Sequence, residues 1–403
     1  MKIFCYDEFD LNYLKNLARY LFFAILWSNF LYSTDVPEKK LKFFTLDWHS
    51  SVTKDLIDIF HDLGHEVTYW SMGLYTQRVF RHDNVKNDPA HDNLILDLWN
   101  PGENLLKLDE KACYEFYEIH KEFLEQFDAY IVSPHSSLAF IFEKLNKPVI
   151  VVNAARYEFP FSVGSSKFNN LNELLIKRKA SGDFFFVSNN KGDRYYLEHY
   201  TGIRSEFIPS LCSYTNAKYK GKNTTFLVHK PVSKDIIESL NKLFAMGRIS
   251  YLESFEDIQS TFEYKGIIHF PYQISVMSLF EQYYANVPLF FPSKKFLLKL
   301  KSQFPFILSS LSLSPCPNVV NSPNNLSDPN ILKKWINLAD FYDKKNMPYI
   351  QYFSSFEELN HLLKVVDTKK ISKKMKKHNI QRKKMIYEKW KKVLEKVAAH
   401  PSC

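Results

Sequence analysis

Hydrophobic and polar positions follow a regular order along the chain from Leu41 onward. The apolar run Lys42–Asp47 predicts a short strand, and apolar residues at helical spacing predict a helix over Val52–Leu63. Gly64 stands where a left-handed helix cap is favoured, and a second strand follows over Glu66–Trp70. Such strand–helix–strand units are typical of a parallel sheet that is buried on both faces.

The same alternation continues through most of the chain. We expect further strands at 128–133, 148–153 and 184–188, and helices at 114–127, 137–145 and 194–200, and the run 207–209 closes the first domain. The polar stretch 214–223 reads as a linker between domains. Beyond it, strands are expected at 225–229, 251–252, within 264–271 and at 288–291, and helices at 234–244, up to 286, and at 356–365. The Pro-, Ser- and Asn-rich stretch 302–328 predicts an irregular insertion.

This pattern predicts an α/β protein with two Rossmann-like doubly wound domains that face a cleft, followed by a C-terminal helix. We place an N-terminal extension at 1–40, the first domain at 41–215, the second at 216–365 and a basic helix and tail at 366–403. Trp390 lies on one apolar stripe of that last helix, which predicts that the helix packs on the body and leaves its lysines in water; the stripe comprises Ile386, Trp390, Val393, Leu394 and Val397.

The N-terminal extension does not decide in which cellular compartment the protein resides. Leu21–Leu31 is apolar, but it is shorter than the roughly 20 residues that span a bilayer. It fits a short signal anchor, a signal-peptide core or an extra helix on the body. Membrane association through residues 20–33 and a cytoplasmic or a Golgi or endoplasmic-reticulum location all remain open.

The positive net charge is concentrated in one segment of the chain. Thirteen Lys or Arg residues and two Glu residues lie between Lys369 and Lys396, so the rest of the chain carries −2 of the total +9. The charge therefore predicts a solvated helix face, or a face for an anionic membrane, and nucleic acid is not favoured because no nucleic-acid-binding signature accompanies it.

The sequence argues against several kinds of bound group. The 10 Gly residues form neither a dinucleotide-binding nor an NTP-binding glycine loop. The five Cys residues are scattered, so neither a disulfide framework nor a zinc site is predicted. We expect no metal and no tightly bound cofactor.

The most informative stretch is Ile267–Ser293, in which a strand, a loop, a helix and a strand follow one another. Backbone N–H groups at the start of such a helix attract phosphate. Glu281, further along the helix, carries a carboxylate that can accept hydrogen bonds from a ribose diol. Pro288 begins the returning strand.

This stretch resembles the donor-binding motif of GT-B glycosyltransferases, especially retaining enzymes with the pattern E-x7-E followed by A-x-A-x-G-x-P-V-V. Glu281 stands seven residues before Pro288, as the second Glu of the pattern does. The resemblance implies GT-B architecture, a nucleotide-sugar donor and ribose binding by Glu281. Gln273 replaces the first Glu, which leaves the sugar and the stereochemistry open. Tyr272 and Ser275 belong to the same loop and are further donor-binding candidates.

Two lysines at the start of the second domain fit the same function. Lys230 follows the predicted strand 225–229, and Lys234 comes four residues later. In the families that this chain resembles, cations at these places pair with the donor diphosphate. Lys230 is therefore predicted to bind the donor and to stabilise the departing diphosphate, with Lys234 beside it and without a metal.

The first domain is predicted to hold the acceptor, because ligands in open α/β sheets bind at the carboxyl ends of the strands. His135 and His49 follow two of these strands and are candidates for a general base. Glu158 and Asp47 are weaker candidates. The predicted acceptor-binding residues are Trp48, Arg156 and Tyr157.

The predicted activity is hexosyl or related transfer from a nucleotide sugar to an acceptor that is a glycan, a lipid or a protein. Two alternatives remain: a sugar-nucleotide epimerase, and a non-catalytic protein of the same fold that uses its basic tail on a membrane or a nucleic acid. The sequons Asn223-Thr224-Thr225 and Asn325-Leu326-Ser327 do not settle the compartment.

Overall fold

The computed structural model describes residues 39–47, 49–71, 79, 99–100, 105–106, 110–229, 232–243, 248–251, 258–311 and 322–403. The chain divides into two compact units, Met1–Lys40 and Leu41–Cys403, and the description below concerns the second. The apolar segment 21–31, Trp48 and Lys230 lie outside the described residues.

The first of two parallel sheets has six strands in the order β2-β1-β5-β6-β7-β8. Phe43 of β1 stands opposite Val67 of β2 and Ala129 of β5, and all pairings in this sheet are parallel. The strands are β1 (Lys42–Asp47), β2 (Glu66–Ser71), β5 (Ala129–Val132), β6 (Val149–Asn153), β7 (Phe184–Ser188) and β8 (Glu206–Phe207). A separate antiparallel pair joins β3 (Trp99–Asn100) to β4 (Leu105–Leu106).

Both faces of the first sheet are buried, which explains why its strands are apolar at nearly every position. Phe44 points into one hydrophobic cluster and its neighbour Phe43 into another, as the two-residue period of a strand requires. The helices around this sheet are α2 (Ser50–Asp62), α5 (Glu110–Leu124), the 3₁₀ helix η1 (Ser136–Phe142), α6 (Ser166–Ser181) and α7 (Lys191–Thr201). Gly64 after α2 has a φ of 90°, as predicted for a left-handed cap.

The second sheet has five strands in the order β10-β9-β11-β12-β13, again all parallel. Its three central strands are buried at every position. The strands are β9 (Phe226–Val228), β10 (Ile249–Tyr251), β11 (Ile267–Ile268), β12 (Leu289–Pro292) and β13 (Gln351–Phe353). The helices are α8 (Lys234–Leu243), α9 (Met277–Tyr284), α10 (Lys294–Gln303), α11 (Pro329–Leu338) and α12 (Phe356–Val365), with 3₁₀ turns η2 (Ser213–Thr215), η3 (Ile258–Glu263) and η4 (Asp340–Tyr342).

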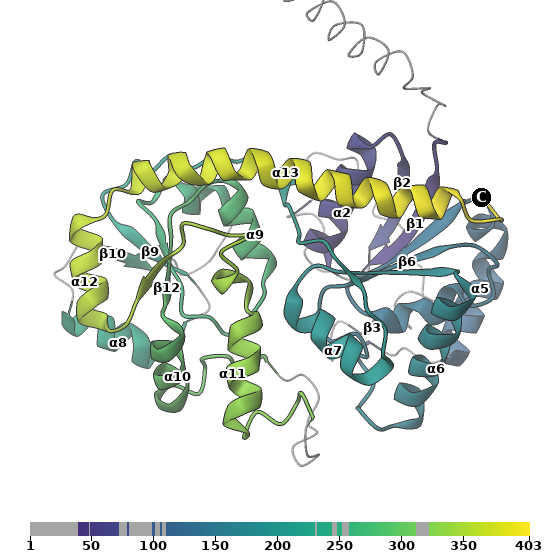
Figure 1. The fold of residues 1–403 in the computed structure, drawn as a ribbon, viewed down its shortest axis with the longest axis horizontal. Coiled ribbons are helices and arrows are strands. Elements are labelled where there is room, and N and C mark those ends of the chain that lie inside the picture. Colours follow the sequence, from purple (N-terminus) through teal and green to yellow (C-terminus); the bar gives the residue numbers. More distant parts are fainter. Residues whose placement is uncertain are drawn as a thin grey trace, which may run out of the picture. The chain divides into compact units, whose positions relative to one another are not determined.

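The chain ends in the long helix α13 (Thr368–Ala398), drawn in yellow in Figure 1, which passes elements of both sheets. In the first half of this helix, Asn379 donates a hydrogen bond to the Tyr283 carbonyl of α9 at 2.8 Å. Further along, Trp390 is 2% exposed and meets Phe60 of α2 with ring centroids 5.3 Å apart. The predicted apolar stripe of this helix is therefore confirmed, and it joins the cluster on one face of the first sheet.

The prediction of two doubly wound parallel sheets followed by a C-terminal helix is confirmed by the strand orders and registers. One local prediction differs, because the helix expected at 137–145 is a 3₁₀ helix whose seven residues are all buried. An apolar segment without a polar face has no amphipathic period to mark its helix type. The helices α6, α10 and α11 and the strand β13 were not predicted from the sequence, and α11 begins directly after the expected insertion.

Candidate functional site

The strand order of the second sheet reverses direction between β9 and β11, and ligands of doubly wound proteins bind outside the carboxyl ends of strands at such a point. His229 follows β9 directly, and His269 follows β11. With the loop 270–276 they line a cavity of about 10 Å³, which holds about one water molecule. The remaining lining residues are Leu279, Phe291 and Phe341.

Three of the predicted donor-binding residues, Tyr272, Gln273 and Ser275, line this cavity. The polar groups of two of these residues already form hydrogen bonds within the chain. The Gln273 amide donates to the Ser310 carbonyl, and its oxygen accepts from the Ile274 N–H at 2.9 Å. The Ser275 hydroxyl is hydrogen-bonded to Asp340. In this conformation, therefore, the loop is closed on itself and on residues 308–310.

Glu281 is only 7% exposed and does not line the cavity. Its carboxylate accepts a hydrogen bond from the Tyr214 hydroxyl, in the segment that joins the two sheets. Burial raises the pKa of Glu281, whereas the hydrogen bond from Tyr214 lowers it. A ribose diol would have to replace Tyr214 in order to reach this carboxylate.

The turn after α9 contains a residue in the left-handed backbone region. In the family pattern a Gly stands two residues before the Pro, and Asn286 holds that position before Pro288. Asn286 has a φ of 67°, in the left-handed region that Gly adopts most readily and Asn next. The Asn379 amide of α13 donates to its side-chain oxygen at 3.0 Å, which fixes the turn.

The predicted cations are only partly observed. Lys234 is the first residue of α8 and its side chain is exposed. Lys230 lies outside the described residues, so its predicted contact with a diphosphate stays a prediction.

The first sheet also reverses direction, between β1 and β5, and both candidate bases lie at that point. His49 is exposed and precedes α2. His135 is 3% exposed, and its Nδ1 lies 2.7 Å from the Arg156 carbonyl, to which it must donate because a carbonyl only accepts. Burial lowers the pKa of His135 to about 4, with the nearby His49 as a smaller cause. A base with so low a pKa is weak. The pKa of His49 is lowered as well, so its exposure rather than its basicity favours it of the two.

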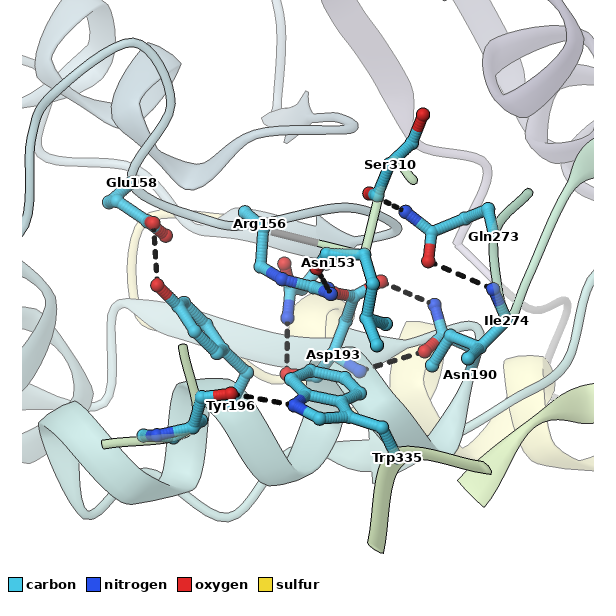
Figure 2. A network of polar contacts seen from close by, with 12 residues as sticks. Asn153, Arg156, Glu158, Asn190, Asp193, Tyr196, Gln273, Ile274, Ser310 and Trp335 are labelled. Atoms are coloured by element: carbon cyan, nitrogen blue, oxygen red, sulfur yellow. Dashed lines mark hydrogen bonds and ion pairs between the residues drawn. The ribbon is translucent and has the colours of Figure 1, made fainter. Parts of the chain in front are cut away.

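Arg156 lies at the centre of a buried polar network (Figure 2). Its guanidinium pairs with Asp193 of α7 and donates to the Leu311 carbonyl. The same group lies 4.2 Å from the ring centroid of Trp335 and 5.1 Å from that of Tyr196. Arginine over aromatic faces in a dry site is a stabilising cation–π contact.

The surrounding hydrogen bonds complete this network. The Asn153 amide donates to the Asp193 carbonyl at 2.9 Å, and the Tyr196 hydroxyl donates to Glu158 at 2.7 Å. Tyr157 is fully buried and donates to Asn172 at 2.6 Å. The acceptor roles of Arg156 and Tyr157 therefore remain predictions that require these contacts to be exchanged for a ligand.

Elements of the two sheets meet closely at Gly192 of α7. A Cβ at this position would lie 2.2 Å from Cδ1 of Ile274 and 2.8 Å from Cζ3 of Trp335. Only a glycine lets the loop after β11 and α11 approach α7 this closely.

We expect Gly192→Ala to lower the free energy of unfolding by about 1–3 kcal/mol, because the added methyl overpacks this contact. Urea denaturation of both proteins measures the difference. In the double variant Gly192→Ala/Ile274→Val the nearest clashing methyl is gone, so part of the loss should be recovered. Equal stability of the single variant and the natural chain would contradict the tight contact.

Several residues of these sites were not singled out from the sequence. His229 and His269 carried a signal, because each is a polar residue directly after a short apolar strand. Trp335, Asp193 and Asp340 carried none, because their importance arises from contacts with residues far away in the chain.

The described residues show neither a cluster of metal-binding side chains nor a membrane-spanning helix. They contain no group of three or more His, Cys, Asp or Glu side chains arranged to hold a metal ion. Within the same residues, every helix is too short or too polar to cross a membrane.

Comparison with known proteins finds distant likenesses among solved structures. No family model and no curated protein matches the chain. Among solved structures, the chain is similar to CalG4, described as the calicheamicin glycosyltransferase, at 9% sequence identity and a TM-score of 0.43. The match covers 89% of this chain and 99% of that one. The strand order and register of the two sheets, rather than this likeness, establish the fold class.

Proposed function

We propose that this protein is a glycosyltransferase that moves a hexosyl or related sugar from a nucleotide-sugar donor to a glycan, lipid or protein acceptor. One observation carries the proposal. The segment that resembles the GT-B donor motif forms the strand–loop–helix–strand unit β11–α9–β12 at the reversal point of the second parallel sheet. Ligands bind at that point in doubly wound proteins.

The start of α9 suits the diphosphate of such a donor. Its cap residue is Val276, which offers no side-chain acceptor to the first N–H groups of the helix, and its first turn has no acidic residue. Free N–H groups and the positive end of the helix dipole favour a phosphate there. The exposed Lys234, the predicted Lys230 and these groups would stabilise the leaving diphosphate without a metal.

Residues beside the first sheet lie close enough to α9 to form the part of the site that binds the acceptor. Asn189, one residue beyond β7, donates to Sδ of Met277 in the first turn of α9 at 4.0 Å. Ser51 of α2 is hydrogen-bonded to Tyr214, which in turn binds Glu281. An acceptor hydroxyl near His49 would therefore approach a donor bound at α9, and His49 would accept its proton.

Donor binding requires the site to open. The cavity beside α9 has room for about one water molecule, and the contacts Gln273–Ser310 and Tyr214–Glu281 occupy groups that a nucleotide would use. We propose that the donor replaces these two contacts.

The test is a thermal-shift screen of the full chain against nucleotides and nucleotide sugars. A ligand at 100 times its dissociation constant adds about 2.7 kcal/mol of stability. We expect one nucleoside diphosphate and its sugar conjugates to raise the unfolding temperature, and Glu281→Ala to abolish this rise.

Tyr214→Phe serves as the matched variant for this screen. It removes the hydroxyl that binds Glu281 and leaves the carboxylate available, so nucleotide stabilisation should be retained or enhanced. If no nucleotide raises the unfolding temperature of the natural chain, the proposed donor site is wrong.

A second candidate function is a non-catalytic protein that binds an anionic surface. The observation that favours it is the lysine face of α13, which remains in water while the apolar stripe packs on the body. The exposed lysines of this helix are Lys369, Lys370, Lys373, Lys374, Lys376, Lys377, Lys384, Lys391, Lys392 and Lys396. Binding of anionic vesicles together with a negative nucleotide screen would favour this function.

A further inference from the structure

Four neutral side chains beside the cavity form one continuous hydrogen-bonded chain. His269 Nε2 lies 2.7 Å from Gln282 Oε1, and Gln282 Nε2 lies 3.3 Å from His229 Nδ1. His229 Nε2 in turn lies 3.3 Å from the Ser278 hydroxyl. The residues come from the ends of β9 and β11 and from α9, so the second sheet and its motif helix meet in this relay.

The amide of Gln282 gives the relay a direction. Its oxygen can only accept, so His269 Nε2 carries a proton, and its nitrogen can only donate, so His229 Nδ1 carries none. In a neutral imidazole the proton of His229 then sits on Nε2 and is donated to Ser278. The Ser278 oxygen is thereby used as an acceptor, and its own proton is left to point elsewhere.

Both imidazoles are held neutral by their surroundings. His269 is 3% exposed and stacks on Phe291 with ring centroids 4.5 Å apart. Burial lowers the pKa of His229 to about 4 and that of His269 well below its usual value. His229 and Ser278 are only partly buried, so the open end of the relay is accessible to a ligand.

We propose that the relay His269–Gln282–His229–Ser278 fixes the hydrogen-bond polarity of the donor site, so that Ser278, which accepts from His229, presents its own proton to a diphosphate oxygen. This inference rests on the proposed nucleotide-sugar function and adds to it one binding hydroxyl, Ser278, and three residues that position it. A diphosphate oxygen is a pure acceptor, so it gains from a serine hydroxyl whose proton is directed away from the relay. A neutral ligand with hydroxyl groups gains less, because it can turn its own donors and acceptors either way.

Gln282→Glu tests the direction of the relay. A carboxylate only accepts, so it would take protons from both His269 Nε2 and His229 Nδ1. His229 Nε2 would then become an acceptor, and the Ser278 proton would turn back toward it. A hydrogen bond to a charged group contributes more than a neutral one, so we expect the affinity for a nucleoside diphosphate to fall by about tenfold or more.

Isothermal titration with uridine, guanosine and thymidine diphosphates and with the matching nucleosides measures this effect. The expected result is a loss of diphosphate affinity in Gln282→Glu with little change in nucleoside affinity. Ser278→Ala removes the terminal hydroxyl without adding charge, and it should show the same selective loss. An unchanged ratio of diphosphate to nucleoside affinity in both variants overturns the relay, while failure of every diphosphate to bind the natural chain overturns the proposed function with it.

A second measurement uses the natural protein alone and requires neither a ligand nor a variant. The ¹⁵N spectrum of histidine-labelled full-length protein distinguishes a protonated from a bare ring nitrogen. The relay requires His229 to carry its proton on Nε2 and His269 to carry a proton on Nε2. A His229 signal with the proton on Nδ1 contradicts the relay whatever the protein binds.

Discussion

Asp193→Ala is expected to lower the free energy of unfolding by about 3–5 kcal/mol, because it leaves a buried arginine without its carboxylate partner. The side chains of Arg156 and Asp193 are 3% and 4% exposed, so water cannot replace the lost interaction. Asn190, which donates to the same carboxylate at 2.7 Å, also loses its partner. Urea denaturation followed by circular dichroism measures the change.

Two variants distinguish a buried charge pair from a general loss of contacts. Glu263→Ala removes one partner of the surface pair with Lys220, whose side chains are 27% and 53% exposed, and should cost about 0–1 kcal/mol. Arg156→Met/Asp193→Leu replaces both charges with apolar groups and should be less destabilising than Asp193→Ala alone. If Asp193→Ala is as mild as Glu263→Ala, the buried pair does not stabilise the fold.

The free energy of unfolding is expected to fall as the pH rises from about 6.5 to 8, because burial raises the pKa of Asp340 in the folded protein. Below 6.5 the raised pKa values of three buried acids and the lowered pKa values of the buried His135, His229 and His269 act in opposite directions. Burial raises the pKa of Asp340 to about 8 and that of Asp55 to about 6, and it also raises that of Glu281. A raised acid pKa means that the folded state binds more protons than the unfolded one. The stabilisation is complete below the unfolded pKa of 3.8, and it is lost as the pH passes about 6 for Asp55 and about 8 for Asp340.

Asp340→Asn isolates the largest of these contributions. Asp340 is 1% exposed, Ser275 is hydrogen-bonded to it, and its Oδ2 has no hydrogen-bond partner among the described residues. An amide keeps the acceptor oxygen and never ionises, so the variant should lose less stability between pH 6 and 8. The difference in slope should approach about 1.4 kcal/mol per pH unit for one group.

Thermal unfolding of both proteins at several pH values provides the measurement. Asp235→Asn on α8 is the control, because Asp235 is exposed and its substitution should leave the slope unchanged. Parallel pH profiles for the natural chain and Asp340→Asn would show that Asp340 ionises in the folded state as it does in the unfolded one.

Elements with a local signal were predicted well. The strand Phe184–Ser188 and the helix Phe356–Val365 have the bounds expected from their apolar periodicity. The helix α6 carried a comparable signal that was not used, since Ser165 caps it and Phe168, Leu171 and Leu175 lie on its buried face. The strand β13 has only three residues, which is too short for a period to be recognised.

The residues of the candidate site likewise fall into two groups: some were predicted from a local motif, and others are brought together only by the tertiary structure. Tyr272, Gln273 and Ser275 were predicted from a motif in one continuous segment, and the structure brings them to one cavity. His229 and His269 are adjacent because β9 and β11 pair, with ring centroids 4.4 Å apart. No local pattern contains that pairing, because the strands are about forty residues apart.

The sequence by itself determined two parallel sheets, the basic C-terminal helix with its docking stripe, and the helix that carries Glu281. These features depend on neighbours within one or two turns or strands, where side-chain period and turn chemistry decide the structure. The tertiary structure alone decided which polar groups are buried together: Arg156 with Asp193 and Trp335, Glu281 with Tyr214, and the relay from His269 to Ser278. Buried polar groups must find partners, and the partners are set by strand order and by the approach of distant segments.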